Sequence, residues 1–289
     1  MSNPEKIALL TDSTADLPAP MREGKPIYVV PLKIRCEDGE YSDGVDITAE
    51  GVYERLHRGE LPRTSLPEGG VVSDTLDQIR ADGYERVIAV MLSSGLSGTY
   101  NMVRLQAGQR DDLEIAVFDS RSGSLGIGIM VLQLWEEIVA GASWETLVRE
   151  RAPHLVANTF PFFSVDTLEY LKRGGRISKT TALAGGLLNI KPVLTIENGE
   201  ILLVGKARGS RQGNNLLVEK IHACGGIDFS LPILLGYTGL TDVFLKKYVE
   251  DSRALWENGT DRLDSTLIGG VIGTHAGPGA VAVAFFRKK

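Results

Sequence analysis

The first half of the chain alternates short apolar runs with segments of helical periodicity. The apolar runs are rich in Val and Ile, as in buried strands, and the segments between them repeat apolar residues every three to four positions. Strands that alternate with helices predict βαβ units with right-handed crossovers around a parallel sheet. The expected strands are 7–10, 27–30, 87–92 and 115–118, and the expected helices are 76–81, 98–109 and 123–140.

The pattern changes near residue 155, where prolines punctuate the chain and the strand signals become less evenly spaced. Two apolar runs, 193–196 and 201–204, flank the dipeptide Asn198-Gly199. That dipeptide favours the two-residue turn of a β-hairpin, because both residues tolerate positive φ. A last apolar run, 281–286, predicts a terminal strand. This half therefore predicts a mixed sheet in an α+β arrangement.

Length and composition are those of a globular protein with two domains, or with one large one. The chain has 289 residues, of which 43% are hydrophobic and 24% charged. A chain of this size buries roughly 73% of its unfolded surface. At roughly 100–200 residues per domain, we expect a three-layer α/β/α domain with a parallel sheet over 1–155. We expect an α+β domain with a mixed sheet over 156–289.

Cysteine usage and hydropathy indicate a cytoplasmic protein. The two cysteines, Cys36 and Cys224, are far apart and form no C-x-x-C pair, which excludes a disulfide framework and a thiolate zinc site. The N-terminus does not read as a signal peptide. The longest apolar stretch, near 125–135, is too short to span a bilayer. We therefore expect the protein in the cytoplasm.

Hydroxyl residues and glycines fill the segment 93–100, directly after one predicted strand and directly before a predicted helix. Backbone N–H groups at the start of a helix bind anions, helped by the positive end of the helix dipole. Open α/β sheets also bind ligands at the carboxyl ends of their parallel strands. Ser93, Ser94 and Gly95 are therefore candidate anion ligands, with a plain Ser/Thr helix cap as the alternative interpretation.

Two further places can add polar groups to the same pocket. Thr64 and Ser65 stand on a loop and can lend hydroxyls. His275 lies in the glycine-rich segment 269–279, where a ligand or another backbone can approach closely. Its imidazole can donate a hydrogen bond or carry a proton, although a histidine in a structural turn is the alternative. Because no second His or Cys stands at ligand spacing, the sequence predicts no metal site.

The charge is unevenly distributed along the chain. The net charge of −6 argues against a general nucleic-acid binder. The segment 172–211 nevertheless contains eight basic and two acidic residues, a local net charge of +6, so the remainder carries −12. Arg176 belongs to one basic cluster in it and Arg208 to another. These clusters suggest a patch for phosphate or an acidic partner, with a merely solvated face as the alternative.

The motifs of nucleotide binding and nucleophilic catalysis are incomplete. The nucleophile-elbow pattern G-x-S-x-G fails because Thr99 stands in place of the last glycine. Neither Gly-Lys pair is followed by the Ser or Thr of a P-loop, and no G-x-G-x-x-G is present. None of these motifs is therefore complete. An autonomous hydrolase or transferase that uses Ser94 or Ser97 with His275 stays open as an alternative.

Four motifs, in order, resemble the DegV family. They are Thr11-Asp-Ser-Thr-Ala-Asp-Leu-Pro18, Ser93-Ser-Gly-Leu-Ser-Gly-Thr-Tyr100, Tyr170-Leu-Lys-Arg-Gly-Gly-Arg-Ile177 and Gly273-Thr-His-Ala-Gly-Pro-Gly279. The best-understood members of this family are the fatty-acid-binding subunits of bacterial fatty acid kinase. The resemblance implies a two-domain fold that buries one long-chain fatty acid in a tunnel, with no cofactor. Burial of such a chain, about C14–C20, contributes about 0.8 kcal/mol per CH₂.

The resemblance also implies roles for particular residues. Thr64, with Ser94 or its neighbour Ser93, would hydrogen-bond the carboxylate, beside Ser65 and Gly95. His275, Arg176 and Arg208 match basic positions near the carboxylate that serve a partner kinase and its phosphate. The kinase subunit would bring ATP and convert the carboxylate into an acyl phosphate while the acyl chain stays in this protein. The chain would then be a carrier for phospholipid metabolism with no nucleotide site and no catalytic residue of its own. It would contact membrane surfaces transiently for loading.

One segment departs from the family pattern. Members often read Thr-Ser-Gln-Pro-Ser where this chain reads Thr64-Ser-Leu-Pro-Glu68. A carboxylate at Glu68 would disfavour a fatty acid anion unless it points to solvent, and Leu66 would alter the mouth of the pocket. A second alternative function is a lipid-sensing regulatory protein whose basic patch binds an acidic partner other than a kinase.

Overall fold

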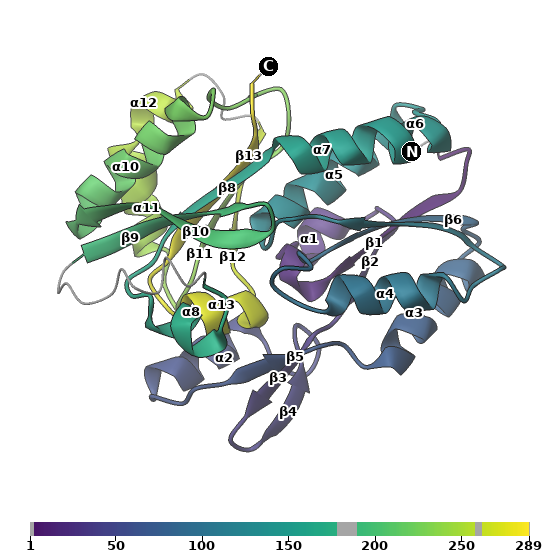
Figure 1. The fold of residues 1–289 in the computed structure, drawn as a ribbon, viewed down its shortest axis with the longest axis horizontal. Coiled ribbons are helices and arrows are strands. Elements are labelled where there is room, and N and C mark those ends of the chain that lie inside the picture. Colours follow the sequence, from purple (N-terminus) through teal and green to yellow (C-terminus); the bar gives the residue numbers. More distant parts are fainter. Residues whose placement is uncertain (1–2, 178–189, 258–261, 289) are drawn as a thin grey trace.

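The computed structural model describes residues 3–177, 190–257 and 262–288. It contains three sheets. Figure 1 shows a four-stranded sheet on the right, a six-stranded sheet on the left and a small three-stranded sheet at the bottom. Within the described residues no helix is both long and apolar enough to cross a membrane.

The four-stranded sheet is the parallel sheet that the sequence predicts. It is built from β1 (Ile7–Asp12), β2 (Ile27–Val30), β6 (Arg86–Met91) and β7 (Glu114–Asp119), in the order β2-β1-β6-β7, and every pairing is parallel. Side chains of β1 alternate between its two faces, as in any strand. Ala8 and Leu10 pack in the cluster of α3 (Gly69–Ala81) and α4 (Thr99–Ala107), whereas Ile7 and Leu9 pack in the cluster of α5 (Leu125–Val139). The sheet therefore lies between two helical layers.

The six-stranded sheet is mixed, as expected for the second half. Its order is β10-β9-β8-β13-β11-β12, and only the pair β11–β12 is parallel. The predicted hairpin is confirmed, and its turn has Asn198 at φ 51° and Gly199 at φ 85°. The strands are β8 (Thr159–Ser164), β9 (Ile190–Glu197), β10 (Glu200–Arg208), β11 (Ile233–Tyr237), β12 (Leu263–Leu267) and β13 (Val281–Phe286).

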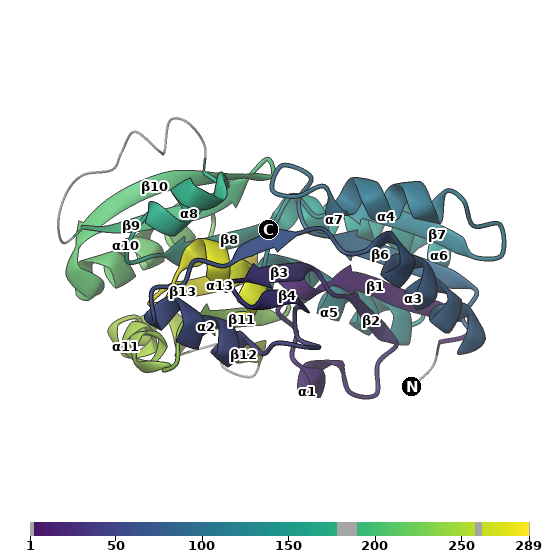
Figure 2. The same cartoon turned by 90° about the horizontal axis from the view of Figure 1, so that it is seen from below.

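The small sheet, in the order β4-β3-β5, is antiparallel and was not predicted from the sequence. It comprises β3 (Lys33–Cys36), β4 (Gly39–Ser42) and β5 (Arg63–Ser65). Figure 2 shows it beside α13 (Gly270–Ala276), which carries His275. The other α-helices are α1 (Ala19–Arg22), α2 (Ala49–His57), α6 (Trp144–Thr146), α7 (Ala152–Asn158), α8 (Glu169–Gly174), α10 (Gly209–Ala223), α11 (Val243–Asp251) and α12 (Arg253–Trp256). A short 3₁₀ helix, η1 (Ser13–Ala15), and a π-helical segment, η2 (Leu147–Arg151), complete the described elements.

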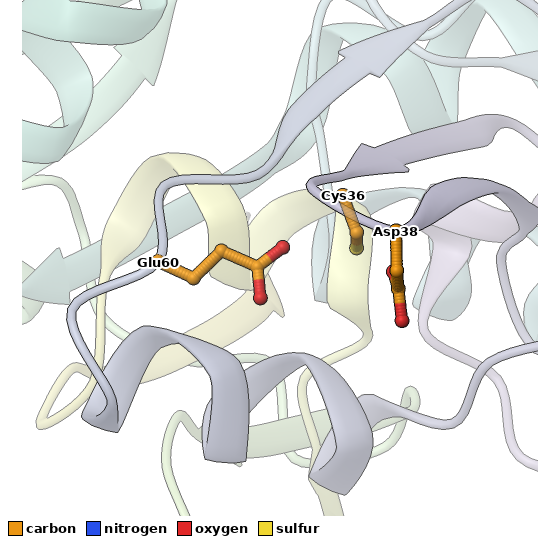
Figure 3. A group of neighbouring side chains, drawn as sticks. All are labelled: Cys36, Asp38 and Glu60. Atoms are coloured by element: carbon orange, nitrogen blue, oxygen red, sulfur yellow. The ribbon is translucent and has the colours of Figure 1, made fainter.

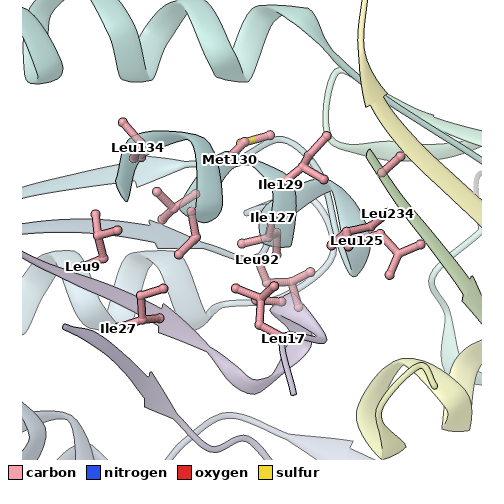
Figure 4. Packing of buried hydrophobic residues seen from close by; sticks show 14 of the residues in the cluster. Leu9, Leu17, Ile27, Leu92, Leu125, Ile127, Ile129, Met130, Leu134 and Leu234 are labelled. Carbon is pink, nitrogen blue, oxygen red and sulfur yellow. The ribbon is translucent and has the colours of Figure 1, made fainter. Parts of the chain in front are cut away.

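Helix α5 packs against both large sheets. Its residues Ile127 and Ile129 belong to one buried cluster with Leu9 of β1 and Leu234 of β11 (Figure 4). A Cβ on Gly128 would lie 2.8 Å from the Ala15 carbonyl oxygen and 3.1 Å from Leu234, so only glycine allows this close approach. The boundary proposed between 155 and 156 falls inside α7. The division of the chain into two domains stays a prediction.

Candidate functional site

An apolar cavity of about 250 Å³ lies where the loops after the parallel strands meet the six-stranded sheet and α13. Leu92 follows β6 and Gly123 follows β7, and both line it. Ligand sites of this kind are mostly apolar with a few polar groups that fix the orientation of the ligand. The polar residues in the lining are Thr64, Ser65, Ser97, Ser124, Arg176 and His275.

A second hollow, of about 510 Å³, adjoins the apolar cavity. Thr64, Arg176 and His275 line both spaces, so these three residues stand at the junction. The outer part of the hollow includes Arg63 and Arg173, which are exposed. An apolar chamber thus leads through a polar junction to a positively charged surface.

Thr64 and His275 are in direct contact at this junction. Strand β5 positions Thr64 and α13 positions His275, and the Thr64 hydroxyl lies 2.7 Å from Nε2 of the ring. Helix α8 ends against the imidazole, where a Cβ on Gly174 would overlap the ring. Burial, with a smaller contribution from the charge of Arg176, lowers the pKa of His275 to about 4. The imidazole is therefore neutral near pH 7.

The neutral ring carries one proton, and its surroundings favour Nε2 as the place for it. Nδ1 is buried and has no hydrogen-bond partner among the described residues. A buried N–H without a partner is rarer in proteins than an unpaired acceptor, so we assign the proton to Nε2. Nε2–H then donates to the Thr64 oxygen, and the Thr64 hydroxyl hydrogen is free to point into the cavity. Thr64 therefore offers a donor to an anion.

Arg176 adds positive charge to the junction. Its Nε donates to the Leu96 carbonyl at 3.1 Å, and a terminal nitrogen donates to the Gly174 carbonyl at 2.5 Å. These bonds to neutral carbonyls hold the guanidinium in place without neutralising it. Across the described ranges no carboxylate forms an ion pair with Arg176. The side chain can therefore attract an anion at the end of the cavity.

The loop 93–97 contributes one hydroxyl, that of Ser97, to the lining of the cavity. Ser93, Ser94 and Gly95 are absent from the lining of the cavity, whereas Ser97 from the same loop lines it. Ser97 precedes α4, accepts from the Thr99 N–H at 3.3 Å and shares a hydrogen bond with the Thr99 hydroxyl at 2.9 Å. Sequence reasoning included Ser97 in the anion-binding segment 93–100 and named it as a possible nucleophile, but it did not name Ser97 among the candidate anion ligands. Its position just before the helix was the signal for an anion-binding hydroxyl.

Ser93 and Ser94 both have other partners. The buried Ser93 hydroxyl donates to the Gly199 carbonyl at 2.9 Å and accepts from the Gly95 N–H at 3.1 Å. Ser94 is exposed, and its hydroxyl and N–H donate to the Asp119 carboxylate at 2.5 and 3.1 Å. A second carboxylate beside Asp119 would be repelled. The role of either serine as a carboxylate ligand stays a prediction.

The remaining candidates are divided between the apolar cavity and the surface. Ser65 lines the apolar cavity, but Arg208 is exposed and lines neither space; its backbone N–H donates to Gln212 at 3.1 Å. Glu68 points to solvent, because its side chain is 64% exposed and pairs with Lys33 at 2.8 Å. This carboxylate therefore does not oppose an anion in the cavity. Leu66 is part of the lining, so the departure from the family pattern does alter the cavity wall.

Two buried carboxylates position α13, and sequence reasoning missed both roles. Asp16 accepts from the Gly269 N–H at 2.8 Å and from the Ser124 hydroxyl at 2.5 Å. Asp43 accepts from the N–H groups of Gly270 and Val271. Burial raises the pKa of Asp16 to about 8 and that of Asp43 to about 6. Asp16 stands in the first of the four family motifs, but turn chemistry is the commoner reason for an Asp directly after a strand.

One group of side chains has the spacing of metal ligands, within the part of the chain that the structure describes. Figure 3 shows Cys36, Asp38 and Glu60 around a common space. The Arg55 guanidinium already binds Asp38 at 2.8 Å and Glu60 at 3.2 Å. Burial also raises the pKa of the Cys36 thiol, which disfavours the thiolate that a metal needs. The group is therefore better described as an ion-pair cluster than as a metal centre.

Comparisons with known proteins agree with this architecture. The family model described as "Uncharacterised protein, DegV family" matches residues 6–288. A DegV domain-containing protein of Clostridium acetobutylicum is 38% identical over 285 residues, which cover 98% of this chain and 100% of that protein. A fatty-acid-binding DegV family protein from Thermus thermophilus superposes with a TM-score of 0.87 at 30% identity, over 98% of this chain and 100% of that chain. A stearic-acid-binding protein from Eubacterium ventriosum gives 0.83 at 26% identity, over 97% and 98%.

Proposed function

This chain belongs to the DegV family, and from that premise we propose that its apolar cavity binds a long-chain fatty acid. The observation that carries the proposal is an apolar chamber that ends at Thr64, Arg176 and His275. Each buried CH₂ of an acyl chain contributes about 0.8 kcal/mol, so the chamber supplies affinity and the polar end supplies orientation. The fatty-acid ligands named for the related solved structures support the same ligand class.

The carboxylate would bind at the junction of the two spaces. The Thr64 hydroxyl donates to one carboxylate oxygen, Arg176 supplies the opposite charge, and Ser97 stands in the same lining. Neutral His275 fixes the direction of the Thr64 hydroxyl without adding a second charge. The Ser93 hydroxyl would have to break its hydrogen bond to Gly199 before it could bind this carboxylate. The Ser94 hydroxyl would likewise have to break its bond to Asp119.

We further propose that the protein is a carrier that presents the carboxylate to an ATP-dependent kinase subunit in the cytoplasm. The hollow with Arg63 and Arg176 gives a phosphoryl group a positively charged approach to the junction, whereas Arg173 in the same lining is paired with Glu169 at 2.6 Å. A carboxylate oxygen would attack the γ-phosphorus of ATP, the bond to the bridging oxygen would break, and ADP would leave with that oxygen. The partner would contact the basic surface that includes Arg208.

The side-chain contacts favour a carrier over a hydrolase that uses a serine nucleophile. A serine nucleophile needs a base within hydrogen-bond reach. In the structure Ser94 pairs with Asp119, Ser97 pairs with Thr99, and His275 pairs with Thr64. Neither serine is bonded to the imidazole. The polar residues at the junction are therefore better suited to holding a carboxylate than to attacking an ester.

Mass spectrometry tests the ligand directly. Freshly purified protein is measured under native conditions and again after organic extraction, and the delipidated protein is titrated with oleate. We expect one fatty acid per chain and saturable rebinding. Protein that carries no lipid and also fails to bind oleate contradicts the proposal. Turnover of activated acyl esters by the pure protein would instead favour the hydrolase.

A second assay tests presentation to the kinase. The loaded protein is incubated with ATP and a fatty acid kinase subunit, and hydroxylamine traps any acyl phosphate as a hydroxamate. We expect hydroxamate only when both proteins and ATP are present. If the protein binds fatty acid but no hydroxamate forms, the proposed ligand stands and the proposed kinase partner is wrong. A lipid-dependent partner recovered in its place would favour the regulatory alternative.

A further inference from the structure

The turn of the β9–β10 hairpin is docked onto the loop that follows β6. The Ser93 hydroxyl donates to the Gly199 carbonyl at 2.9 Å, and both residues are buried although they lie 106 positions apart. The approach is close enough that a Cβ on Gly95 would lie 2.6 Å from the same carbonyl oxygen. A buried side-chain hydrogen bond therefore joins the four-stranded half of the molecule to the tip of the hairpin.

The docked hairpin also forms a wall of the apolar cavity. Ile196 and Ile201 flank the turn, and both line the cavity. They pack in one hydrophobic cluster with Leu96, which lies in the loop that also holds Ser93. A Cβ on Gly123, in the loop after β7, would lie 3.5 Å from Ile196. Displacement of the hairpin tip would therefore open the cavity on this side.

From this geometry we propose that Ser93 is a positioning residue that latches the hairpin over the cavity and sets how long a fatty acid stays bound. The inference rests on the proposed fatty-acid function and assigns Ser93 a role other than that of a carboxylate ligand. The hydroxyl is already used between Gly199 and Gly95. The groups that it bridges are backbone atoms of the wall, and they are not at the junction with Thr64.

Dissociation kinetics test the latch. A fluorescent long-chain fatty acid is released from wild type and from Ser93→Ala into excess unlabelled oleate, in a stopped-flow instrument. Loss of the hydrogen bond to the Gly199 carbonyl predicts release that is roughly three to ten times faster, with an association rate within about twofold of wild type. The control is Ser252→Ala, which removes another buried serine hydroxyl bonded to a backbone carbonyl, that of Tyr248, outside the cavity lining. Release from Ser252→Ala should match wild type.

A ligand without a carboxylate distinguishes a latch from a carboxylate ligand. A fluorescent fatty alcohol of the same length should also leave Ser93→Ala faster, by a similar factor, because the wall is loosened for any chain. Faster release of the acid alone would overturn the latch and restore Ser93 as a carboxylate ligand. Wild-type release of both ligands would also overturn it.

Hydrogen exchange gives a readout that needs no ligand. In the ligand-free protein, amides 196–201 should exchange faster in Ser93→Ala than in wild type or Ser252→Ala. Equal exchange would contradict the latch even if the protein bound no fatty acid, so failure of the latch and failure of the proposed function are separable. If Ser93→Ala does not fold, Ser93→Cys takes its place, because its weaker S–H donor predicts intermediate release and exchange. Ser93→Cys with wild-type rates would overturn the proposal.

Discussion

The Thr64 hydroxyl lies 2.7 Å from Nε2 of His275, across 211 residues of sequence. This contact joins the small sheet to α13, and it lies where the apolar cavity meets the basic hollow. Because the imidazole is neutral near pH 7, the pair can orient a hydroxyl donor toward an anion without adding charge.

Thr64→Val keeps the shape of the side chain and removes its hydroxyl. We expect fatty acid affinity to fall by roughly tenfold to a hundredfold, because a hydrogen bond to a charged group contributes about 1.5–3 kcal/mol. Isothermal titration of delipidated protein with oleate measures the change. Thr75→Val is the matched control, since the Thr75 hydroxyl donates to Val71 within α3, outside the cavity lining. Equal affinity of both variants would remove Thr64 from the carboxylate site.

His275 should make stability depend on pH below neutrality. Its pKa is about 6.5 in an unfolded chain and about 4 in the folded protein. The unfolded state therefore binds more protons between these values, and the contribution of this group to stability is lost as pH falls from about 6.5 to 4. His275→Gln has no such titrating group. The free energy of unfolding of wild type should therefore fall relative to that of the variant as pH falls through this window. Urea unfolding at a series of pH values checks this, and a constant gap would contradict it.

The carboxyl group of Asp16 should make stability depend on pH in the opposite direction. Its pKa is raised to about 8 in the folded protein, so folding favours the protonated form, and stability is lost as pH rises from about 4 to 8. Asp16→Asn imitates the protonated carboxyl and should gain stability relative to wild type across that window. Asp16→Ala leaves the partners Ser124 and Gly269 without an acceptor, at about 1–3 kcal/mol for each buried group. Thermal unfolding of both variants between pH 5 and 9 gives the comparison.

Gly128→Ala should destabilise the protein by about 1–3 kcal/mol, the usual cost of an overpacked core. The new methyl group would meet the Ala15 carbonyl and Leu234. The control is Gly70→Ala in α3, where a Cβ meets nothing within 4 Å. That change should stabilise by up to about 1 kcal/mol, because alanine is the better helix former. A Tm for Gly128→Ala at or above that of Gly70→Ala would contradict the packing described for α5.

Local sequence patterns were sufficient to predict the strands and the hairpin that carry clear apolar runs and turn residues. The four parallel strands and the Asn198-Gly199 hairpin follow from apolar runs and turn residues. Strand β8 escaped prediction because Pro161 reads as a breaker, yet it pairs between β13 and β9. Strand β5 is three residues long and polar. Its place is set by pairing with β3, which no local pattern records.

Some residues of the candidate site could likewise be predicted from the sequence, and the placement of others could not. Thr64, Ser65, Arg176 and His275 were identified by residue type and motif, and the structure brings all four to one cavity. The choice among the serines of 93–97 depended on the path of a loop between packed elements. Ser97 lines the cavity, whereas Gly95, two residues earlier in the same loop, lies against the Gly199 carbonyl in the hairpin turn. Such placement is decided by tertiary packing, which residue type does not specify.

The position of α5 also bears on how the protein unfolds. This helix buries residues on nearly every side and contributes them to a core that includes strands of both large sheets. Neither half can lose its structure without exposing one face of the same helix to water. We therefore expect one cooperative unfolding transition in calorimetry, with α5 amides among the slowest to exchange. A fragment cut near residue 155 would keep α5 with one apolar face uncovered, and it should aggregate rather than fold as an independent unit.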